Sequence, residues 1–360
     1  MREFNYSKYK DYKWDSEILG LVSGIHEYRG RQELYLTQKP AVLDKLVEVA
    51  KVQSTESSNA IEGIFTSNTR LNQLMQSKTT PKNRDEEEIA GYRFVLDMIH
   101  ESYEYIPISS NYILQLHQNL YRFTNRSIGG HFKNSDNHIV ARDENGIEQV
   151  IFEPLSPIET PIAIDRICEE FNRVSATEEV DTLLLIPIFI HDFLCVHPFN
   201  DGNGRMSRLL TTLLLYRAGY VVGRYVSLEK KIADLKDLYY DSLNMSQNGW
   251  HEGKEDPTPF IKYILKTIIA AYKDFEERIE IIDIKEPAIE QVRAAVYKKI
   301  GKFTKSEIME MCPKLGRASV ENSLTALVNE EVLERRGRGR GTYYVRKDAL
   351  VWLFQVVNWL

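Results

Sequence analysis

The residues best suited to chemistry stand together in one short stretch, His197–Arg208, which reads HPFNDGNGRMSR. His197 is a candidate base for a hydroxyl proton, because imidazole changes its charge near neutral pH. Asp201 offers the oxygen ligands that a hard cation such as Mg²⁺ prefers. Arg205 and Arg208 stand three residues apart, so both guanidinium groups can bind neighbouring phosphates. The stretch therefore predicts a polyphosphate site beside a proton acceptor.

Two helices are expected to position these residues. The preceding segment, Asp181–Val196, is apolar almost all round, which is typical of a buried central helix and is too short to span a membrane. Pro198 should end that helix. Gly202 and Gly204 allow backbone N–H groups to approach an anion closely, and a second helix, Arg205–Ala218, adds the partial positive charge of its N-terminus. The anion would thus lie at the turn between the helices.

The stretch fills every fixed position of the pattern H-P-F-x-D/E-G-N-G-R-x-x-R, so it resembles the signature of the Fic family. The resemblance implies an enzyme that transfers AMP from ATP to a Ser, Thr or Tyr hydroxyl of a target protein or of itself. It implies that His197 is the catalytic base and that Asp201 holds Mg²⁺. Gly204 stands where the kinase-like Doc branch has lysine, which favours AMP transfer over phosphate transfer.

The same resemblance assigns the remaining residues of the stretch. Arg205 would bind the β-phosphate and Arg208 the γ-phosphate of ATP. Phe199 would be a buried structural anchor. The anion hole would be lined by Gly202, Asn203 and Gly204.

A helix well upstream carries a second pattern. Residues 37–63 are expected to form one long helix, with Pro40 in its first turn and Gly63 as its C-terminal cap. Ser58 and Glu62 are four residues apart and therefore lie on one face. They resemble the inhibitory motif S/T-x-x-x-E-G/N of Fic proteins that carry their inhibitor in the same chain. A solvated Ser–Glu pair at a helix end would give the same pattern.

The resemblance gives this motif a physical consequence. Glu62 would pair with Arg208 and compete with the γ-phosphate, so that ATP could bind only with its α-phosphate misplaced for in-line attack. Removing the carboxylate should then activate the enzyme. The same carboxylate is a candidate base for water, which makes removal of AMP from a modified protein a linked hypothesis.

Residues 129–152 predict a hairpin with its turn at Asn145–Gly146. This segment resembles the Fic flap, whose edge takes up a target segment by strand addition. Lys133 stands where the family commonly has arginine. His138 and Ile139 are the candidate target contacts, although an ordinary surface hairpin would look similar.

A downstream helix, Lys236–Asn244, is the candidate wall of the base pocket. By resemblance, Tyr239 or Tyr240 would stack on or edge the adenine, and Asn244 would hydrogen-bond to it. Paired tyrosines at helical spacing also occur in ordinary cores, so a purely structural role stays open.

The C-terminal residues differ in charge from the rest of the chain. Residues 287–360 hold thirteen Lys/Arg and eight Asp/Glu, a formal charge of +5, which leaves −11 for residues 1–286. Three helices are expected at Ile289–Ile300, Lys305–Met311 and Ser319–Glu330, followed by a basic Gly/Arg turn and a strand over Arg335–Val345. This order resembles a winged helix, a module that often binds DNA. Because the third helix carries an acid and little basic charge, docking to protein or packing within the chain ranks equally.

Composition is that of a folded globular enzyme, with 43% hydrophobic and 27% charged residues among 360. Met1–Asn5 has no apolar signal core, and the three scattered cysteines argue for a reducing, cytoplasmic setting without structural zinc. Residues 1–30 are expected to form an extended or strand-bearing lead-in.

The parts together predict a mainly α fold: an N-terminal helical region over 1–100, a Fic-type helical core with a β-hairpin flap over 101–286, and a winged-helix-like domain over 287–360. The family resemblance extends over about 20–285. Two function classes follow, a protein adenylyltransferase using ATP and Mg²⁺, or a DNA-binding regulator that uses the Fic core as a nucleotide sensor. Expected partners are a protein substrate, DNA or protein at the C-terminal domain, and a second copy in a homodimer, with no membrane. Removal of AMP and transfer of another nucleotide stay open within the enzyme class.

Overall fold

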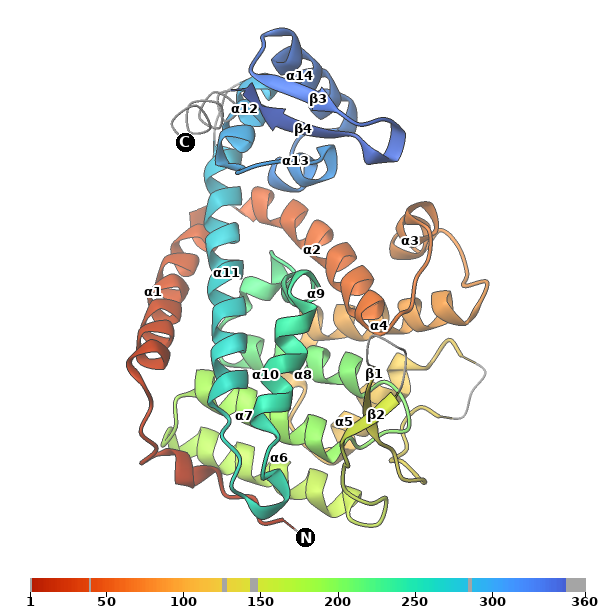
Figure 1. The fold of residues 1–360 in the computed structure, drawn as a ribbon, viewed down its shortest axis with the longest axis vertical. Helices are drawn as coiled ribbons and strands as arrows, with labels where there is room; N and C mark the ends of the chain where they lie inside the picture. The colour runs from red at the N-terminus through yellow and green to blue at the C-terminus, as the bar shows by residue number, and fades with distance from the viewer. Residues whose placement is uncertain (1, 39, 125–127, 143–147, 284–286, 348–360) are drawn as a thin grey trace, which may run out of the picture. The chain divides into compact units, whose positions relative to one another are not determined.

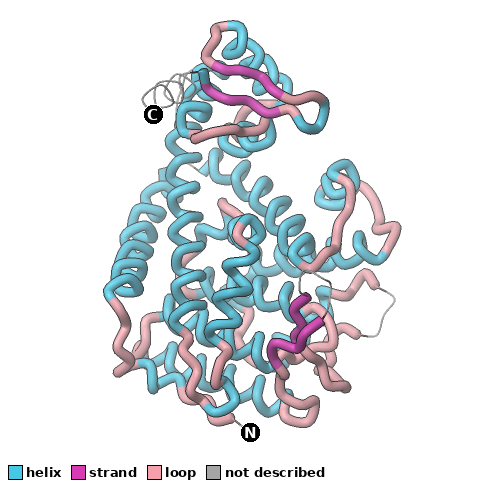
Figure 2. The backbone as a smooth tube through the Cα atoms, in the orientation of Figure 1, coloured by secondary structure: helices cyan, strands magenta, loops and turns pink. Residues whose placement is uncertain are grey.

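The computed structural model describes residues 2–38, 40–124, 128–142, 148–283 and 287–347. Within these ranges the chain has fourteen α-helices and two small antiparallel sheets of two strands each, so the mainly α prediction is confirmed. Figure 2 shows how few strands there are among the helices. In the described ranges, no helix combines the length and apolar character needed to cross a membrane.

The chain divides into two compact units, Met1–Gln32 with Ala50–Tyr272, and Glu33–Val49 with Lys273–Leu360. The predicted domain divisions near residues 100 and 287 remain predictions. Elements up to the flap are α1 (Ser16–Gln38), α2 (Pro40–Ile61), α3 (Asn68–Met75), α4 (Arg84–Ser102), α5 (Ser110–Leu120), β1 (Ile139–Arg142) and β2 (Glu148–Phe152). They are followed by α6 (Thr160–Thr177), α7 (Thr182–Val196), α8 (Asn203–Arg217), α9 (Leu228–Asp234), α10 (Lys236–Ser246) and α11 (Thr258–Asp283).

Both helices predicted around the motif are present, although the second begins at Asn203 and not at Arg205. The Asp181 side chain caps α7 by accepting a hydrogen bond from the Leu183 amide, and nearly every residue of α7 is buried. The following helix, α8, begins at Asn203 and packs against α7 and α4. The motif turn therefore lies between two buried helices.

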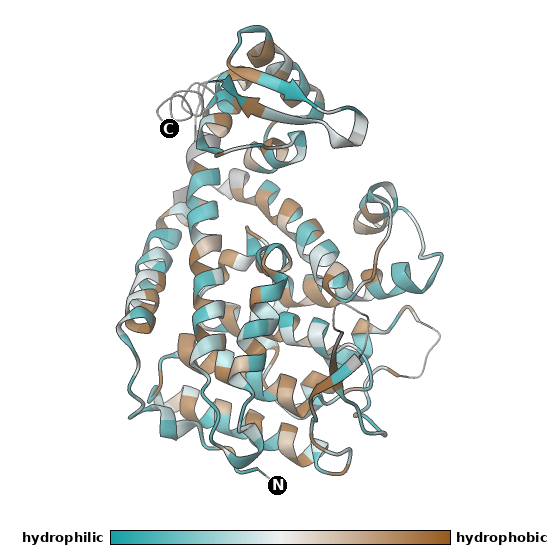
Figure 3. Cartoon of the chain, viewed as in Figure 1, coloured by the Kyte–Doolittle hydropathy of each residue, from teal (hydrophilic) through white to brown (hydrophobic). Residues whose placement is uncertain are grey.

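The other helices carry both hydrophobic and hydrophilic residues, as the brown and teal segments of Figure 3 show.

The prediction of an extended lead-in over residues 1–30 is wrong. Helix α1 begins at Ser16, preceded by a short 3₁₀ turn at Tyr6–Tyr9. Asp15 accepts a hydrogen bond from the Ile18 amide at 2.9 Å, and Ile18 and Ile25, seven residues apart, are fully buried. This seven-residue spacing is helical, so burial of one apolar stripe outweighs the several glycines of the segment.

The predicted inhibitory helix begins later than expected. Helix α2 starts at Pro40, and Thr37 belongs to the preceding helix α1. Pro40 is the first described residue of α2. Gly63 follows the helix with φ of +78°, the left-handed conformation expected of a C-terminal cap.

The second unit contains α12 (Ala288–Lys298), α13 (Lys305–Met311), α14 (Arg317–Asn329), β3 (Leu333–Arg336) and β4 (Tyr343–Arg346). Thr304 and Glu307 form a capping box at the start of α13. Arg335 and Arg336, predicted in the turn, lie in β3 opposite Tyr344 and Tyr343. Cross-strand pairing with these tyrosines explains why the strand extends into the basic residues.

Candidate active site

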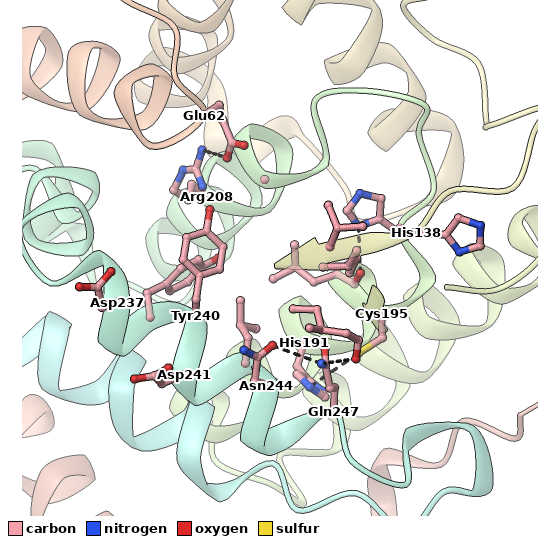
Figure 4. A pocket seen from close by; sticks show the side chains of 18 residues that line it. Glu62, His138, His191, Cys195, Arg208, Asp237, Tyr240, Asp241, Asn244 and Gln247 are labelled. Atoms are coloured by element: carbon pink, nitrogen blue, oxygen red, sulfur yellow. Dashed lines mark hydrogen bonds and ion pairs between the residues drawn. The ribbon is translucent and has the colours of Figure 1, made fainter. Parts of the chain in front are cut away.

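A cavity of about 720 Å³ lies where α2, the flap, the turn between α7 and α8, and α10 meet. It brings together most of the predicted site residues, and Figure 4 shows Glu62 and Arg208 joined at one end with Asn244 and Gln247 at the other. The predicted residues that line it are Glu62, His138, Ile139, His197, Gly204, Arg208, Tyr239, Tyr240 and Asn244.

His197 follows the last residue of α7 in a left-handed conformation, with φ of +50°. Its Nδ1 lies 3.3 Å from the Leu194 carbonyl oxygen. A carbonyl only accepts, so Nδ1 carries the proton and Nε2 keeps a free lone pair. Burial lowers the pKa of His197 to about 4, and the nearby Lys133 charge acts in the same direction. The imidazole is therefore neutral at pH 7 and able to accept a proton.

The turn after His197 is closed by Asn203. Its side chain accepts a hydrogen bond from the Phe199 amide at 2.9 Å and donates one to the Phe199 carbonyl at 2.7 Å. Gly202 has φ of +86°, and a Cβ on Gly204 would lie 2.2 Å from Glu62 Oε1. Gly202 is thus required for its backbone conformation, whereas a side chain at Gly204 would displace the Glu62 carboxylate.

Phe199 is fully buried and stacks on His117, with ring centroids 3.6 Å apart. His117 accepts a hydrogen bond from the Gly130 amide at Nδ1 and donates one from Nε2 to the Asp201 carbonyl. It therefore joins the base of the flap to the motif turn. His117 was not predictable from the sequence, because it stands on α5 with no local motif around it.

Arg208 is bound by the two residues of the predicted inhibitory motif. Its Nη2 donates to Glu62 Oε1 at 2.7 Å and to the Ser58 carbonyl at 2.9 Å, and its Nε donates to Ser58 Oγ at 2.8 Å. The Arg208 side chain is 3% exposed, and that of Glu62 is 32% exposed. The guanidinium is thus buried and paired on the side that faces α2.

Arg205 and Asp201 do not line this cavity, and neither do Gly202 and Asn203. Arg205 Nη2 donates to Tyr121 Oη at 2.7 Å, lies 2.8 Å from Glu88 Oε2 and lies 3.6 Å from Asp201 Oδ1. Its Nε and Nη1 are buried without a hydrogen-bond partner among the described residues. Such orphaned donors are unusual, and a phosphate oxygen would satisfy them.

The Asp201 side chain is 40% exposed, and its Oδ2 lies 3.2 Å from Arg84 Nη2. Among the described residues, no group of three His, Cys, Asp or Glu side chains could hold a metal. One carboxylate fits Mg²⁺ when substrate phosphates and water complete the coordination, which is the usual arrangement for this ion. The chemistry of the site therefore fits a metal that arrives with the nucleotide.

The predicted base pocket is partly core. Tyr239 is buried and packs against Tyr240, Phe260 and Tyr263, whereas Tyr240 is 38% exposed. The Asn244 amide oxygen accepts from Gln247 Nε2 at 3.2 Å, and its N–H groups have no partner in the described part of the chain.

The flap is an antiparallel pair of strands, β1 and β2, with Val140 opposite Val150. His138 is exposed at its start, and Ile139 is half-buried. The predicted Asn145–Gly146 turn lies outside the described residues. Lys133 is buried at the base of the flap, where its Nζ donates to the Val196 carbonyl.

The segment that contains the motif matches a known protein family. The family model described as Fic/DOC matches residues 107–215, which include α5, the flap, α7 and most of α8. The chain therefore carries a Fic/DOC domain and is related to Fic protein adenylyltransferases at about 26% identity.

Two curated relatives show the extent of this similarity. A Fido domain-containing protein of Dictyostelium discoideum is 25% identical over 147 residues, which cover 40% of this chain and 98% of that protein. The protein adenylyltransferase Fic of Drosophila melanogaster is 26% identical over 250 residues, which cover 68% of this chain. The chain spans only 43% of the length of that Drosophila relative.

The fold is shared with solved structures. A Fic family protein from Desulfovibrio desulfuricans G20 is 20% identical with a TM-score of 0.61, covering 93% of this chain and 97% of that chain. Fic-1 from C. elegans is 21% identical with a TM-score of 0.59, covering 73% of each chain. These likenesses show a Fic-type helical fold.

Proposed function

We propose that this chain transfers AMP from ATP to a hydroxyl side chain of a protein and that Glu62 inhibits the transfer. The observation that carries the proposal is that neutral His197 and paired Arg208 line one cavity beside Gly204. A proton acceptor next to a phosphate-binding cation is what nucleotidyl transfer to a hydroxyl requires.

In this mechanism His197 Nε2 takes the proton of the target hydroxyl. The hydroxyl oxygen forms a bond to the α-phosphorus as the bond from that phosphorus to the bridging oxygen breaks, and pyrophosphate leaves. Arg208, once free of Glu62, binds the γ-phosphate and so places the α-phosphorus in line with the hydroxyl. Arg205 provides the orphaned donors for a neighbouring phosphate. A Mg²⁺ ion held by Asp201 would neutralise phosphate charge.

For residues 287–347 we propose a winged-helix-like module that contacts protein rather than DNA. Glu321 on α14 pairs with both Lys305 and Arg317, so one of the two positive charges beside this helix is neutralised. Binding to a phosphate backbone needs unneutralised Lys and Arg. A salt-sensitive affinity for double-stranded DNA would instead favour the regulator hypothesis.

The test of AMP transfer uses ATP labelled at the α-phosphate, with Mg²⁺, the purified protein and a cytosolic lysate. Wild type, Glu62→Gly and Glu62→Gly with His197→Ala are compared side by side. Label should rise in the single variant and disappear in the double variant. Absence of label in all three, with ATP still bound, would contradict the proposal.

A further inference from the structure

Two residues at the base of the flap, Lys133 and Asn137, donate hydrogen bonds to four successive backbone carbonyls around His197. Lys133 Nζ donates to the Val196 carbonyl at 3.0 Å, and the Lys133 backbone amide donates to the Pro198 carbonyl at 2.8 Å. Asn137 Nδ2 donates to the carbonyls of His197 at 3.3 Å and Phe199 at 3.1 Å. The whole connection out of α7 therefore rests on the segment that leads into β1.

The two side chains also hold each other. Lys133 Nζ donates to Asn137 Oδ1 at 2.9 Å, which fixes the amide so that its Nδ2 faces the turn. Lys133 is only 3% exposed, and its ammonium lies beyond the last turn of α7, where a helix leaves carbonyls unsatisfied and its dipole is negative. Burying a lysine is costly, and burial lowers the pKa of Lys133 to about 8. A buried cation at this place implies a specific task.

The turn has a reason to need such support. His197 is not glycine, yet it holds φ of +50°, a conformation that costs roughly 1 kcal/mol or more for a side-chain-bearing residue. Strain of this kind persists only where the surroundings enforce it. The hydrogen bonds from Lys133 and Asn137 flank His197 on both sides and thus supply that constraint.

We propose that Lys133 and Asn137 are positioning residues for His197 and that they couple the flap to the base. The inference rests on the proposed AMP transfer. Asn137 directly precedes His138 and Ile139, the predicted target contacts, so a target strand added to β1 bears on the same segment that holds the His197 carbonyl. Docking of the target and orientation of the base would then depend on one stretch of backbone.

The first arm of the test measures steady-state AMP transfer in the Glu62→Gly background. Lys133→Met and Asn137→Ala should each lower kcat about 10- to 100-fold while KM for ATP stays within about two-fold, because a small misplacement of a catalytic group costs rate rather than nucleotide binding. Lys133→Arg should restore most of the rate by keeping the buried cation. Ser135→Ala, an exposed position between the two, is the matched control.

The second arm does not depend on activity. The ¹⁵N NMR signals of the His197 ring are assigned by comparison with His197→Ala. They should show Nδ1 protonated in the Glu62→Gly parent and in its Ser135→Ala and Lys133→Arg variants. Lys133→Met and Asn137→Ala should shift or broaden them. If the parent itself transfers no AMP, the proposed function fails and the ring signals alone decide this inference. Unchanged His197 signals in Lys133→Met and Asn137→Ala would overturn the inference, as would kcat values equal to those of an active parent.

Discussion

Replacing Glu62 with glycine should have two opposite effects, one on stability and one on ATP binding. In the folded chain Glu62 Oε1 lies 2.7 Å from Arg208 Nη2, and the guanidinium is almost wholly buried. Losing the carboxylate leaves the buried guanidinium with its hydrogen bonds to Ser58 but with no ion-pair partner among the described residues. Because Glu62 is one-third exposed and water screens part of the pair, we expect a loss of about 1–2 kcal/mol in the free energy of unfolding.

The same free energy appears as a gain in ATP affinity, since the γ-phosphate no longer has to displace a carboxylate. A change of about 1–2 kcal/mol corresponds to roughly a 5- to 30-fold lower Kd. Glu62→Gln, which keeps a hydrogen-bonding oxygen without the charge, should give an intermediate Kd. Glu56→Gln, an exposed carboxylate on the same helix α2, is the matched control and should bind ATP like wild type.

The assay is isothermal titration of Mg·ATP into wild type and these variants, together with urea unfolding of each. If Glu62 competes with the γ-phosphate, Glu62→Gly must show both the lower free energy of unfolding and the lower Kd for ATP. An ATP affinity that is equal in wild type and Glu62→Gly would refute it. So would tighter binding in Glu56→Gln, because the gain would then reflect only a loss of negative charge on α2.

Three further predictions concern the histidines, the motif turn and the metal. Burial lowers the pKa values of four histidines below the ordinary 6.5, to about 3 for His100 and about 4 for His117, His191 and His197. Between pH 6.5 and 4 the unfolded chain therefore binds protons that the native chain does not. The free energy of unfolding should fall with falling pH, by up to about 1.4 kcal/mol per pH unit for each histidine. If urea unfolding gave a constant free energy of unfolding from pH 7 to 5, that result would argue against the burial of these histidines. Asn203→Ala leaves the buried Phe199 amide without its acceptor and should cost about 1–3 kcal/mol by the same unfolding assay, whereas Asn200→Ala, exposed in the same turn, should cost little. Chelation of Mg²⁺ should abolish label incorporation in Glu62→Gly. Adding Asp201→Asn should raise the Mg²⁺ concentration that gives half the maximal rate. If the Mg²⁺ dependence were identical with and without Asp201→Asn, Asp201 would be excluded as the ligand.

The helices around the motif were predictable because their signals are local. The apolar run of α7, the glycines that open α8 and the Thr304 cap of α13 each specify an element through nearby residues. The Ser58–Glu62 motif is also local, although its contact with Arg208 joins residues about 150 positions apart. Only the resemblance to a family could suggest that long-range pairing.

Other parts of the site have no local signal. Lys133, Asn137 and His117 act through backbone carbonyls and amides of distant residues, and a hydrogen bond to a backbone group leaves no pattern in the partner's side chain. The Arg84–Glu88 pair on α4 resembles an ordinary i,i+4 surface pair in sequence, yet Glu88 is buried against Arg205. The lead-in failed for a different reason, since its glycines obscured the helical stripe of α1.

The most direct test of the central claim is which phosphate of ATP ends up on protein. Glu62→Gly is incubated with Mg²⁺ and ATP labelled at either the α- or the γ-phosphate, and protein-bound label is counted with and without His197→Ala. AMP transfer predicts label from the α-position only, and none once His197 is replaced. Label from the γ-position, or α-label that persists without His197, would contradict it.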